Sequence, residues 1–383
     1  MRLSVFQTIR EKRVLALICF GILSVMIVAA FWPFEFHPSN HVTWLSGENG
    51  LRFNAGGIVL SSRDFELPDS QSAAGVSLEL WLEPSQEKYS TALLSFSSHD
   101  NPEQFRLRQS HDFLLVIQEL FATSRHTAAR WLWVPHAFQA HKRRFIAISS
   151  GAQGTTVYLD GIPAESSSTF RIRAKGFSGQ FIVGTSPVVY DTWRGKLFGV
   201  AVFGRELMAT QVAEHYQAWL SGRTELINSD RPAALYTFGE RSGTVAHNQV
   251  ISGPDLAIPA SFRVPCKPFL KSPWREFYPN QAYVRDVVIN IAGFVPLGFF
   301  FCLLFSSSEA SRRSVIATII LGAVFSVTIE ILQGFIPMRD SGTTDIITNT
   351  LGTALGAMLC RSGAVEVLLG KIESRASLKA GHH

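Results

Sequence analysis

The chain has 383 residues, a formal net charge of +5 and a hydrophobic content of 46%, with a mean hydropathy of +0.16. This length allows two or three domains, and a mean hydropathy above zero argues against an ordinary soluble protein. Much of the basic excess lies beside apolar runs, at Arg2, Arg10, Lys12, Arg13, Arg312, Arg313, Lys371, Arg375 and Lys379. Because that placement is typical of membrane topology, we exclude a nucleic-acid partner.

The first apolar run covers residues 14–34 and contains no charged side chain. About 20 apolar residues are enough for a helix to cross a bilayer, and Trp32 lies at the far end, where interfacial aromatic residues are common. The alternative is a cleaved signal peptide. Since the run is longer than a signal-peptide core and no small-x-small cleavage site follows it, we predict an uncleaved anchor after a cytoplasmic N-terminus, residues 1–13.

A helical bundle is predicted near the carboxyl end, over residues 285–360. Its expected helices cover about 287–305, 315–335 and 346–362, which gives about four helices together with the anchor. The apolar part of the last helix, residues 346–359, is short for a membrane span. A complete span and a re-entrant or interfacial helix therefore both remain open for it.

The charges beside these helices predict how the chain is oriented. If the N-terminus is cytoplasmic, the residues between the first two spans face the outside, and Arg312, Arg313 and the tail 361–383 return to the cytoplasm. Every cytoplasmic segment then carries a positive balance, as the positive-inside rule requires. The sequence therefore predicts a multi-pass membrane protein with a large extracytoplasmic region.

That large region, residues 40–262, consists of short alternating runs separated by Gly, Pro, Ser and Asn. In Val76 to Leu82, Leu78, Leu80 and Leu82 alternate and share one face, and Asp160-Gly161 is a typical hairpin turn. One segment, residues 209–220, has helical spacing instead. We predict an all-β antiparallel sandwich, joined to the bundle by a linker over residues 263–284.

Several segments of the sandwich occur in an order that resembles laminin-G/concanavalin A-like (LamG) domains: GLRF at 50–53, SLELWLEP at 77–84, VYLDG at 157–161 and GVAVFGREL at 199–207. The resemblance implies a sugar or calcium site at the loop edges. No acidic loop cluster supplies the roughly six oxygen ligands that calcium needs. Trp131 and Trp133, at alternating positions, would form either a sugar-stacking platform or a buried strand face.

The helical region also contains polar residues that a membrane disfavours: Asp286, Asn290, Glu330, Gln333, Arg339, Asp345 and Asn349. Several are three or four residues apart and so share a helix face. A charge at membrane depth costs at least about 2.5 kcal/mol, so Glu330 needs a partner, for which Arg339 or Arg285 is available. The set predicts either a functional site or interhelical hydrogen bonds that hold the bundle together.

The same residues carry a second resemblance, in RDVVINIAGFVPLGFF at 285–300 and TIEILQGFIPMRDSGTTDIITNTLGTALG at 328–356. Both segments are similar to the VanZ-like family of bacterial membrane proteins. The family pattern falls on Asn290, Phe294, Pro296, Gly298, Glu330, Gln333, Pro337, Arg339, Asp345, Asn349 and Gly352. The resemblance implies a bacterial cytoplasmic (inner) membrane protein of the cell envelope, a link to glycopeptide resistance, and a sandwich inserted between the first two helices.

Two functions follow as hypotheses. In the first, the sandwich recognises an envelope glycan, a lipid-linked precursor or a protein, while the bundle contacts membrane lipid or another membrane protein. In the second, an outer-leaflet enzyme or carrier uses Glu330 for proton exchange and Arg339 to bind an anionic headgroup. A transporter fits less well, because four spans without a visible repeat give a complete alternating-access path only if the protein oligomerises. No catalytic triad, phosphate-binding loop or HExxH motif appears, so neither a cofactor nor a metal is expected and catalysis stays open.

Overall fold

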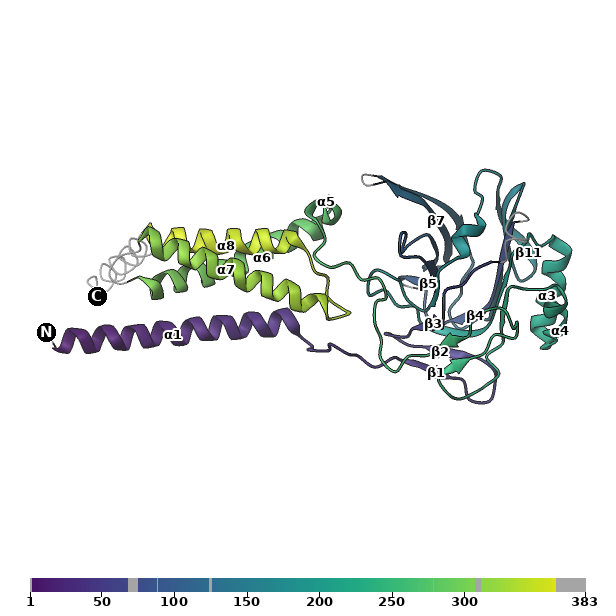
Figure 1. The fold of residues 1–383 in the computed structure, drawn as a ribbon, viewed down its shortest axis with the longest axis horizontal. Helices are drawn as coiled ribbons and strands as arrows, with labels where there is room; N and C mark the ends of the chain where they lie inside the picture. The colour runs from purple at the N-terminus through teal and green to yellow at the C-terminus, as the bar shows by residue number, and fades with distance from the viewer. Residues whose placement is uncertain are drawn as a thin grey trace, which may run out of the picture. The chain divides into compact units, whose positions relative to one another are not determined.

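The computed structural model describes residues 2–67, 75–87, 89–123, 126–277, 279–306 and 311–362. The chain forms two compact units, one of Met1–Phe36 with Pro268–His383 and the other of His37–Lys267. The second unit is an antiparallel β-sandwich and the first is helical (Figure 1). The predicted fold class, an all-β sandwich with a helical bundle of about four helices, is confirmed.

Two eight-stranded antiparallel sheets build the sandwich. The first, which we call the β4 sheet, contains in spatial order β1 (Val42–Trp44), β2 (Leu51–Phe53), β13 (Gly195–Phe203), β4 (Val76–Pro84), β9 (Arg144–Gly151), β10 (Gly154–Leu159) and β11 (Ile162–Ser167), with β14 (Ala234–Tyr236) paired to β13. The second, the β5 sheet, contains β15 (Val245–Ala246), β16 (Leu256–Ala257), β3 (Val59–Ser61), β12 (Gln180–Val183), β5 (Ser90–Ser97), β6 (Phe105–Ser110), β7 (Phe113–Thr123) and β8 (His126–Val134).

Strand β4 shows how the sequence pattern produces two apolar layers. Leu78, Leu80 and Leu82 are all buried in the core between the sheets. The alternate side chains, Glu79 and Trp81, point to the opposite face, as strand geometry requires. That face is also buried, because helix α3 (Ala209–Ser221), followed by the short α4 (Glu225–Ser229), packs over it (Figure 1). Helix α3 confirms the helical spacing predicted for 209–220.

The hairpin between β10 and β11 turns at Asp160 and Gly161, as predicted. Both residues have positive φ, 52° and 79°, which is the conformation of the tight turns that suit two-stranded ribbons. The carboxylate of Asp160 accepts a hydrogen bond from Phe145 N at 3.0 Å and pairs with Arg144. Asp160 is therefore a turn residue whose side chain ties the hairpin to β9.

The helical unit contains α1 (Arg2–Phe31), the short α5 (Pro273–Glu276), α6 (Gln281–Phe305), α7 (Arg312–Gly334) and α8 (Thr343–Arg361). Three segments are long and apolar enough to cross a membrane: Lys12–Phe31, Gln281–Phe305 and Arg312–Gly334. Helix α8 is not among the spans found in the described part of the chain. The predicted tail beyond residue 362 and residues 307–310 lie outside the described residues.

Glycines allow α8 to lie very close to α6 (Figure 1). At Gly298, Gly352 and Gly356, an added Cβ would overlap backbone atoms of the facing helix. Backbones at such short range pack through small residues, as in other membrane helix pairs. The α6–α8 contact therefore depends on the absence of side chains at these three positions.

Candidate functional sites

Glu330 lies near the end of α7 and is buried, with only 1% of its surface exposed. Its Oε2 accepts a hydrogen bond from Gly342 N at 2.8 Å. The main-chain oxygen of Glu330 accepts a second bond from Ser341 Oγ, also at 2.8 Å. Glu330 thus holds the loop that leads from α7 into α8.

The first backbone N–H groups of α8 are bonded by residues from other segments. Thr344 N donates to Glu276 Oε2 at 3.0 Å and Thr343 N donates to Lys271 O at 2.9 Å, next to the Glu330–Gly342 bond. A helix start has four such groups without an intrahelical partner and carries a partial positive charge. Two carboxylates from outside the helix therefore replace the usual N-cap side chain, which Gly342 does not have.

Gln333 and Arg339 bind backbone carbonyl groups at the C-terminal end of α1. Gln333 Nε2 donates to Ala30 O at 3.0 Å, and Arg339 Nη2 donates to Ala29 O at 3.1 Å and Trp32 O at 3.0 Å. Carbonyls in the last turn of a helix have no intrahelical partner and attract cations. These two side chains therefore join the end of α1 to the end of α7.

The expected pairing of Glu330 with Arg339 or Arg285 is not observed. Arg339 binds the α1 carbonyls, and Arg285 lies 3.5 Å from Asp286, with both side chains more than 60% exposed. The expectation failed because it considered only side-chain charges. At helix ends, backbone N–H and C=O groups compete for the same charged side chains.

The remaining three predicted residues, Asn290, Asp345 and Asn349, connect α8 to its neighbours. Asn290 Nδ2 on α6 donates to Asp345 Oδ1 at 2.8 Å, and Asn349 Nδ2 donates to Ser326 Oγ on α7 at 3.0 Å. Asn349 is 4% exposed and its Oδ1 is without a hydrogen-bond partner among the described residues. The structure therefore brings the predicted residues to the bundle end where α1 and α7 finish and α6 and α8 start.

Sequence reasoning missed four members of this bundle end: Lys271, Glu276, Ser326 and Ser341. Glu276 and Lys271 lie in the segment that was predicted to be a linker, where polar residues carry no signal. Lys271 also binds Asp340, with 3.0 Å between Nζ and Oδ1. Only the Pro at the first position of α5 followed by an acid in its first turn could have indicated an ordered helix there.

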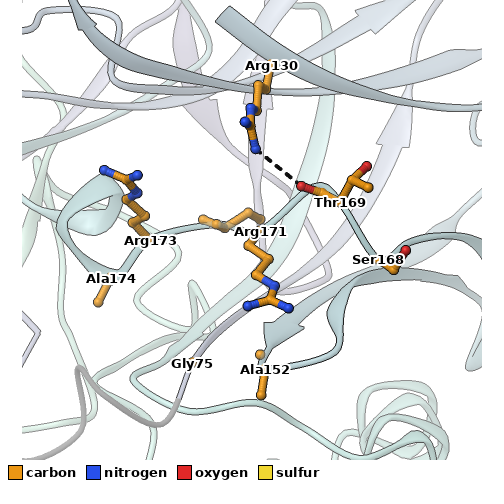
Figure 2. A pocket seen from close by; sticks show the side chains of 10 residues that line it. Gly75, Arg130, Ala152, Ser168, Thr169, Arg171, Arg173 and Ala174 are labelled. Atoms are coloured by element: carbon orange, nitrogen blue, oxygen red, sulfur yellow. Dashed lines mark hydrogen bonds between the residues drawn. The ribbon is translucent and has the colours of Figure 1, made fainter.

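A pocket of about 750 Å³ opens in the sandwich where the edge strands of the two sheets, β8 and β11, come together. Figure 2 shows three arginines around it, one from β8 and two from the segment after β11. Its lining residues are Gly75, Arg130, Gly151, Ala152, Ser168, Thr169, Arg171, Ile172, Arg173 and Ala174. Neither the sequence motifs nor the two resemblances pointed to this pocket.

Alternation directs Arg171 and Arg173 outward. Phe170 and Ile172 are buried in the core, whereas the arginines between and after them are exposed. The backbone is fixed from both sheets: Ile172 N donates to Ser150 Oγ at 2.9 Å. From β7, the amide of Gln118 bonds to Arg171 O at 2.8 Å and Arg173 N at 3.0 Å in the orientation that satisfies both groups.

Arg130 completes the set from the β5 sheet. It is paired in register with Gln118 and donates from Nη1 to Thr169 O at 3.3 Å, the bond drawn in Figure 2. No ion pair joins Arg130, Arg171 or Arg173 to an acid within the described part of the chain. The lining therefore contains three cationic side chains and no carboxylate.

Family models match both parts of the chain. Residues 239–367 match the VanZ/LLP1 model, and residues 56–213 match a model of the concanavalin A-like lectin/glucanases superfamily. The chain therefore contains a VanZ-like region and a concanavalin A-like domain. The VanZ/LLP1 match begins inside the last part of the sandwich and so extends further than the bundle predicted over 285–360.

Several solved structures are similar to part of the chain, at low sequence identity. A SAP-like pentraxin from Limulus polyphemus is 13% identical, with a TM-score of 0.35, covering 60% of this chain and 95% of the pentraxin. A putative carbohydrate binding protein from Bacteroides ovatus is 12% identical, with a TM-score of 0.34 and coverage of 54% and 61%. The receptor binding domain of a botulinum neurotoxin C/D mosaic serotype is 12% identical, with a TM-score of 0.34 and coverage of 47% and 45%. No curated protein matches the chain.

Trp131 and Trp133 of the concanavalin A-like domain are solvent-exposed. Their exposed fractions are 59% and 47%, so the alternative of a buried strand face is wrong. Since side chains alternate along β8, both point away from the face that carries Arg130 and Leu132. The two tryptophans thus form a surface separate from the arginine pocket.

A buried histidine lies between two acids on the outer face of the β4 sheet. His215 Nδ1 of α3 is 2.6 Å from Glu79 Oε1, and its Nε2 is 3.0 Å from Asp230 Oδ2. Trp219 Nε1 donates to the second oxygen of Glu79 at 3.1 Å, and Arg205 pairs with Asp230 at 3.0 Å. The group lies beneath α3, and its bonds tie the helix to β4.

Stability of the sandwich should depend on the protonation of His215. Burial disfavours the charged ring, but the hydrogen bonds and charges of Glu79 and Asp230 outweigh it and raise the pKa of His215 above its ordinary value of 6.5. The folded state then binds the proton more tightly than the unfolded chain. This stabilisation is complete below the unfolded pKa and is lost as pH rises through the folded pKa.

We therefore expect the melting temperature of the sandwich to fall as the pH is raised above about 6.5, the ordinary pKa of histidine. His215→Gln should reduce this dependence, while His99→Gln, at an exposed histidine, should keep it. Melting curves of the full chain in detergent over a pH series measure the effect. An unchanged slope in His215→Gln would show that the buried histidine does not control it.

Proposed function

We propose that this protein is a bacterial cell-envelope component that holds its concanavalin A-like domain on the extracytoplasmic side of the cytoplasmic membrane, where the domain binds an envelope polymer. The bundle anchors the domain and contacts membrane lipid or another membrane protein. The observation that carries the proposal is the shared bundle end. Gln333 and Arg339 bind the last carbonyls of α1, at the end from which the chain continues into the sandwich.

Charges at the opposite bundle end support this orientation. Helices α1 and α7 finish together, so their starts also lie together, with Lys12 and Arg13 beside one span and Arg312 and Arg313 beside the other. Two basic pairs at one end favour that end as cytoplasmic. The sandwich, entered from the other end, would then lie outside.

Cysteine labelling tests the orientation. Single substitutions Ser242→Cys in the sandwich and Ser362→Cys after α8 add a thiol at two exposed residues. In intact spheroplasts, an impermeant maleimide should label Ser242→Cys above the native cysteines, and should label Ser362→Cys only after permeabilisation. The reverse pattern would overturn the proposal.

Binding to the envelope is tested by sedimentation with the full chain in detergent. Purified cell wall should pellet the protein, and a neutral polymer of similar mass, such as cross-linked dextran, should not. Loss of the gene should change envelope composition or antibiotic sensitivity if the binding serves the envelope. Absence of pelleting together with an unchanged envelope would count against this function.

The outer-leaflet enzyme or carrier receives no comparable support from the geometry. It requires Glu330 and Arg339 to act on one ligand. Glu330 binds the backbone of Gly342, whereas Arg339 binds α1. Among the residues that the structure describes, no group of three or more His, Cys, Asp and Glu side chains is arranged to hold a metal ion.

A further inference from the structure

We infer that the pocket of Arg130, Arg171 and Arg173 binds an anionic polymer, whose repeating units carry phosphate or carboxylate groups. The inference rests on the proposed function, since it names the chemical class of the envelope polymer and the residues that select it. Three features of the pocket support the inference independently: the charge of its lining, the backbone hydrogen bonds that hold the arginine segments, and its volume.

No acid in the described part of the chain forms an ion pair with the arginines of the pocket. Three guanidinium groups around one cavity repel one another. Glu206 packs against Gly151 but does not line the pocket. A concave surface of one sign raises the local concentration of oppositely charged ligands, and the planar guanidinium fork suits phosphate and carboxylate oxygens.

One buried residue links the backbone segments that carry the three arginines. Gln118 is 4% exposed, pairs in register with Arg130, and bonds to the backbone of both Arg171 and Arg173. Ile172, between the last two, is anchored in the core and bonded to Ser150. A rigid backbone lowers the entropy that the arginines lose when a ligand orders them.

Size and shape favour a polymer segment over a single ion or a membrane surface. A volume of about 750 Å³ lies within the range of ordinary ligand pockets, about 300–1,000 Å³, and exceeds what one phosphate fills. The three arginines that line the pocket come from β8 and from the segment after β11 (Figure 2). Ser168 and Thr169 add hydroxyl groups beside them.

Binding measurements on the full chain in detergent micelles test the inference. The immobilised probes are a glycerol-phosphate polymer, polygalacturonate and neutral dextran. Inorganic phosphate serves as competitor, and binding to phosphatidylglycerol vesicles is measured separately. The test variant is Arg130→Gln, Arg171→Gln, Arg173→Gln. The matched control, Arg52→Gln, Arg194→Gln, Arg263→Gln, removes three positive charges at exposed arginines elsewhere on the sandwich.

The wild type should bind at least one of the two polyanions and should not bind dextran. The affinity of the pocket variant for that polyanion should fall at least about tenfold, and that of the control variant less than about twofold. The two charged polymers distinguish phosphate from carboxylate as the preferred group. Equal losses in both variants, binding to vesicles alone, or no polyanion binding would each overturn the inference. Melting curves of both variants should match the wild type, because the six arginines are exposed.

The outcome separates this inference from the proposed function. If the pocket variant still pellets with cell wall as the wild type does, the domain binds the envelope elsewhere and only the inference fails. If labelling reverses the orientation, the proposed function fails, while polymer binding in micelles is still measured.

Discussion

Replacing Glu79 by alanine is expected to lower the free energy of unfolding of the sandwich by about 3–5 kcal/mol, the usual cost of removing one partner from a buried charged pair. Glu79 is 0% exposed and both of its carboxylate oxygens are bonded, one to His215 and one to Trp219. The substitution leaves both ring N–H groups without that acceptor beneath α3. Denaturant unfolding followed by tryptophan fluorescence measures the loss.

The control for Glu79→Ala is Glu214→Ala on the outward face of the same helix that covers Glu79. Glu214 is exposed, so its removal should change the free energy of unfolding by no more than about 0.5 kcal/mol. Equal effects of the two substitutions would mean that the buried group does not hold α3 on the sheet.

A leucine at Gly352 is expected to disrupt the packing of α8 on α6, at a cost of about 3 kcal/mol, the upper end of the usual range for overpacking. A Cβ at this position would overlap the carbonyl oxygen of Ile291. Because the obstacle is main chain, only a movement of the whole helix relieves it. We expect a lower melting temperature and less monodisperse protein in detergent.

Gly293 on α6 provides the matched position for that substitution. No heavy atom lies within 4 Å of a Cβ built there. Gly293→Leu makes the same chemical change in a helix interior, where leucine has the higher helix propensity. It should retain the wild-type melting temperature or raise it, and a loss as large as that of Gly352→Leu would exclude close helix contact as the cause.

The fold was predictable because its strongest signals are local. Alternating leucines in β4, the Asp160-Gly161 turn and the long apolar runs follow from the period of strands, turn chemistry and bilayer thickness. Glu79 in the same strand was not recognised as buried. A single sequence shows the alternation, but it does not show that α3 covers the second face.

The candidate sites were less predictable, since they depend on tertiary contacts. The membrane-disfavoured polar residues were recognisable from their cost, yet their partners were not, because Glu330 and Arg339 bind backbone groups of other helices. The arginine pocket combines Arg130 with residues about 40 positions later. Only the meeting of two sheet edges brings them together.

The start of α8 has a consequence for how the protein is made. Helix α8 is not apolar enough to count as a membrane span, and its first N–H groups depend on Glu276 and Glu330. During synthesis these acids are made before the backbone N–H groups that donate to them. Glu330 therefore gains its backbone partner only after residue 342 has been made, and a chain truncated after residue 334 would keep the Glu330 carboxylate without that partner.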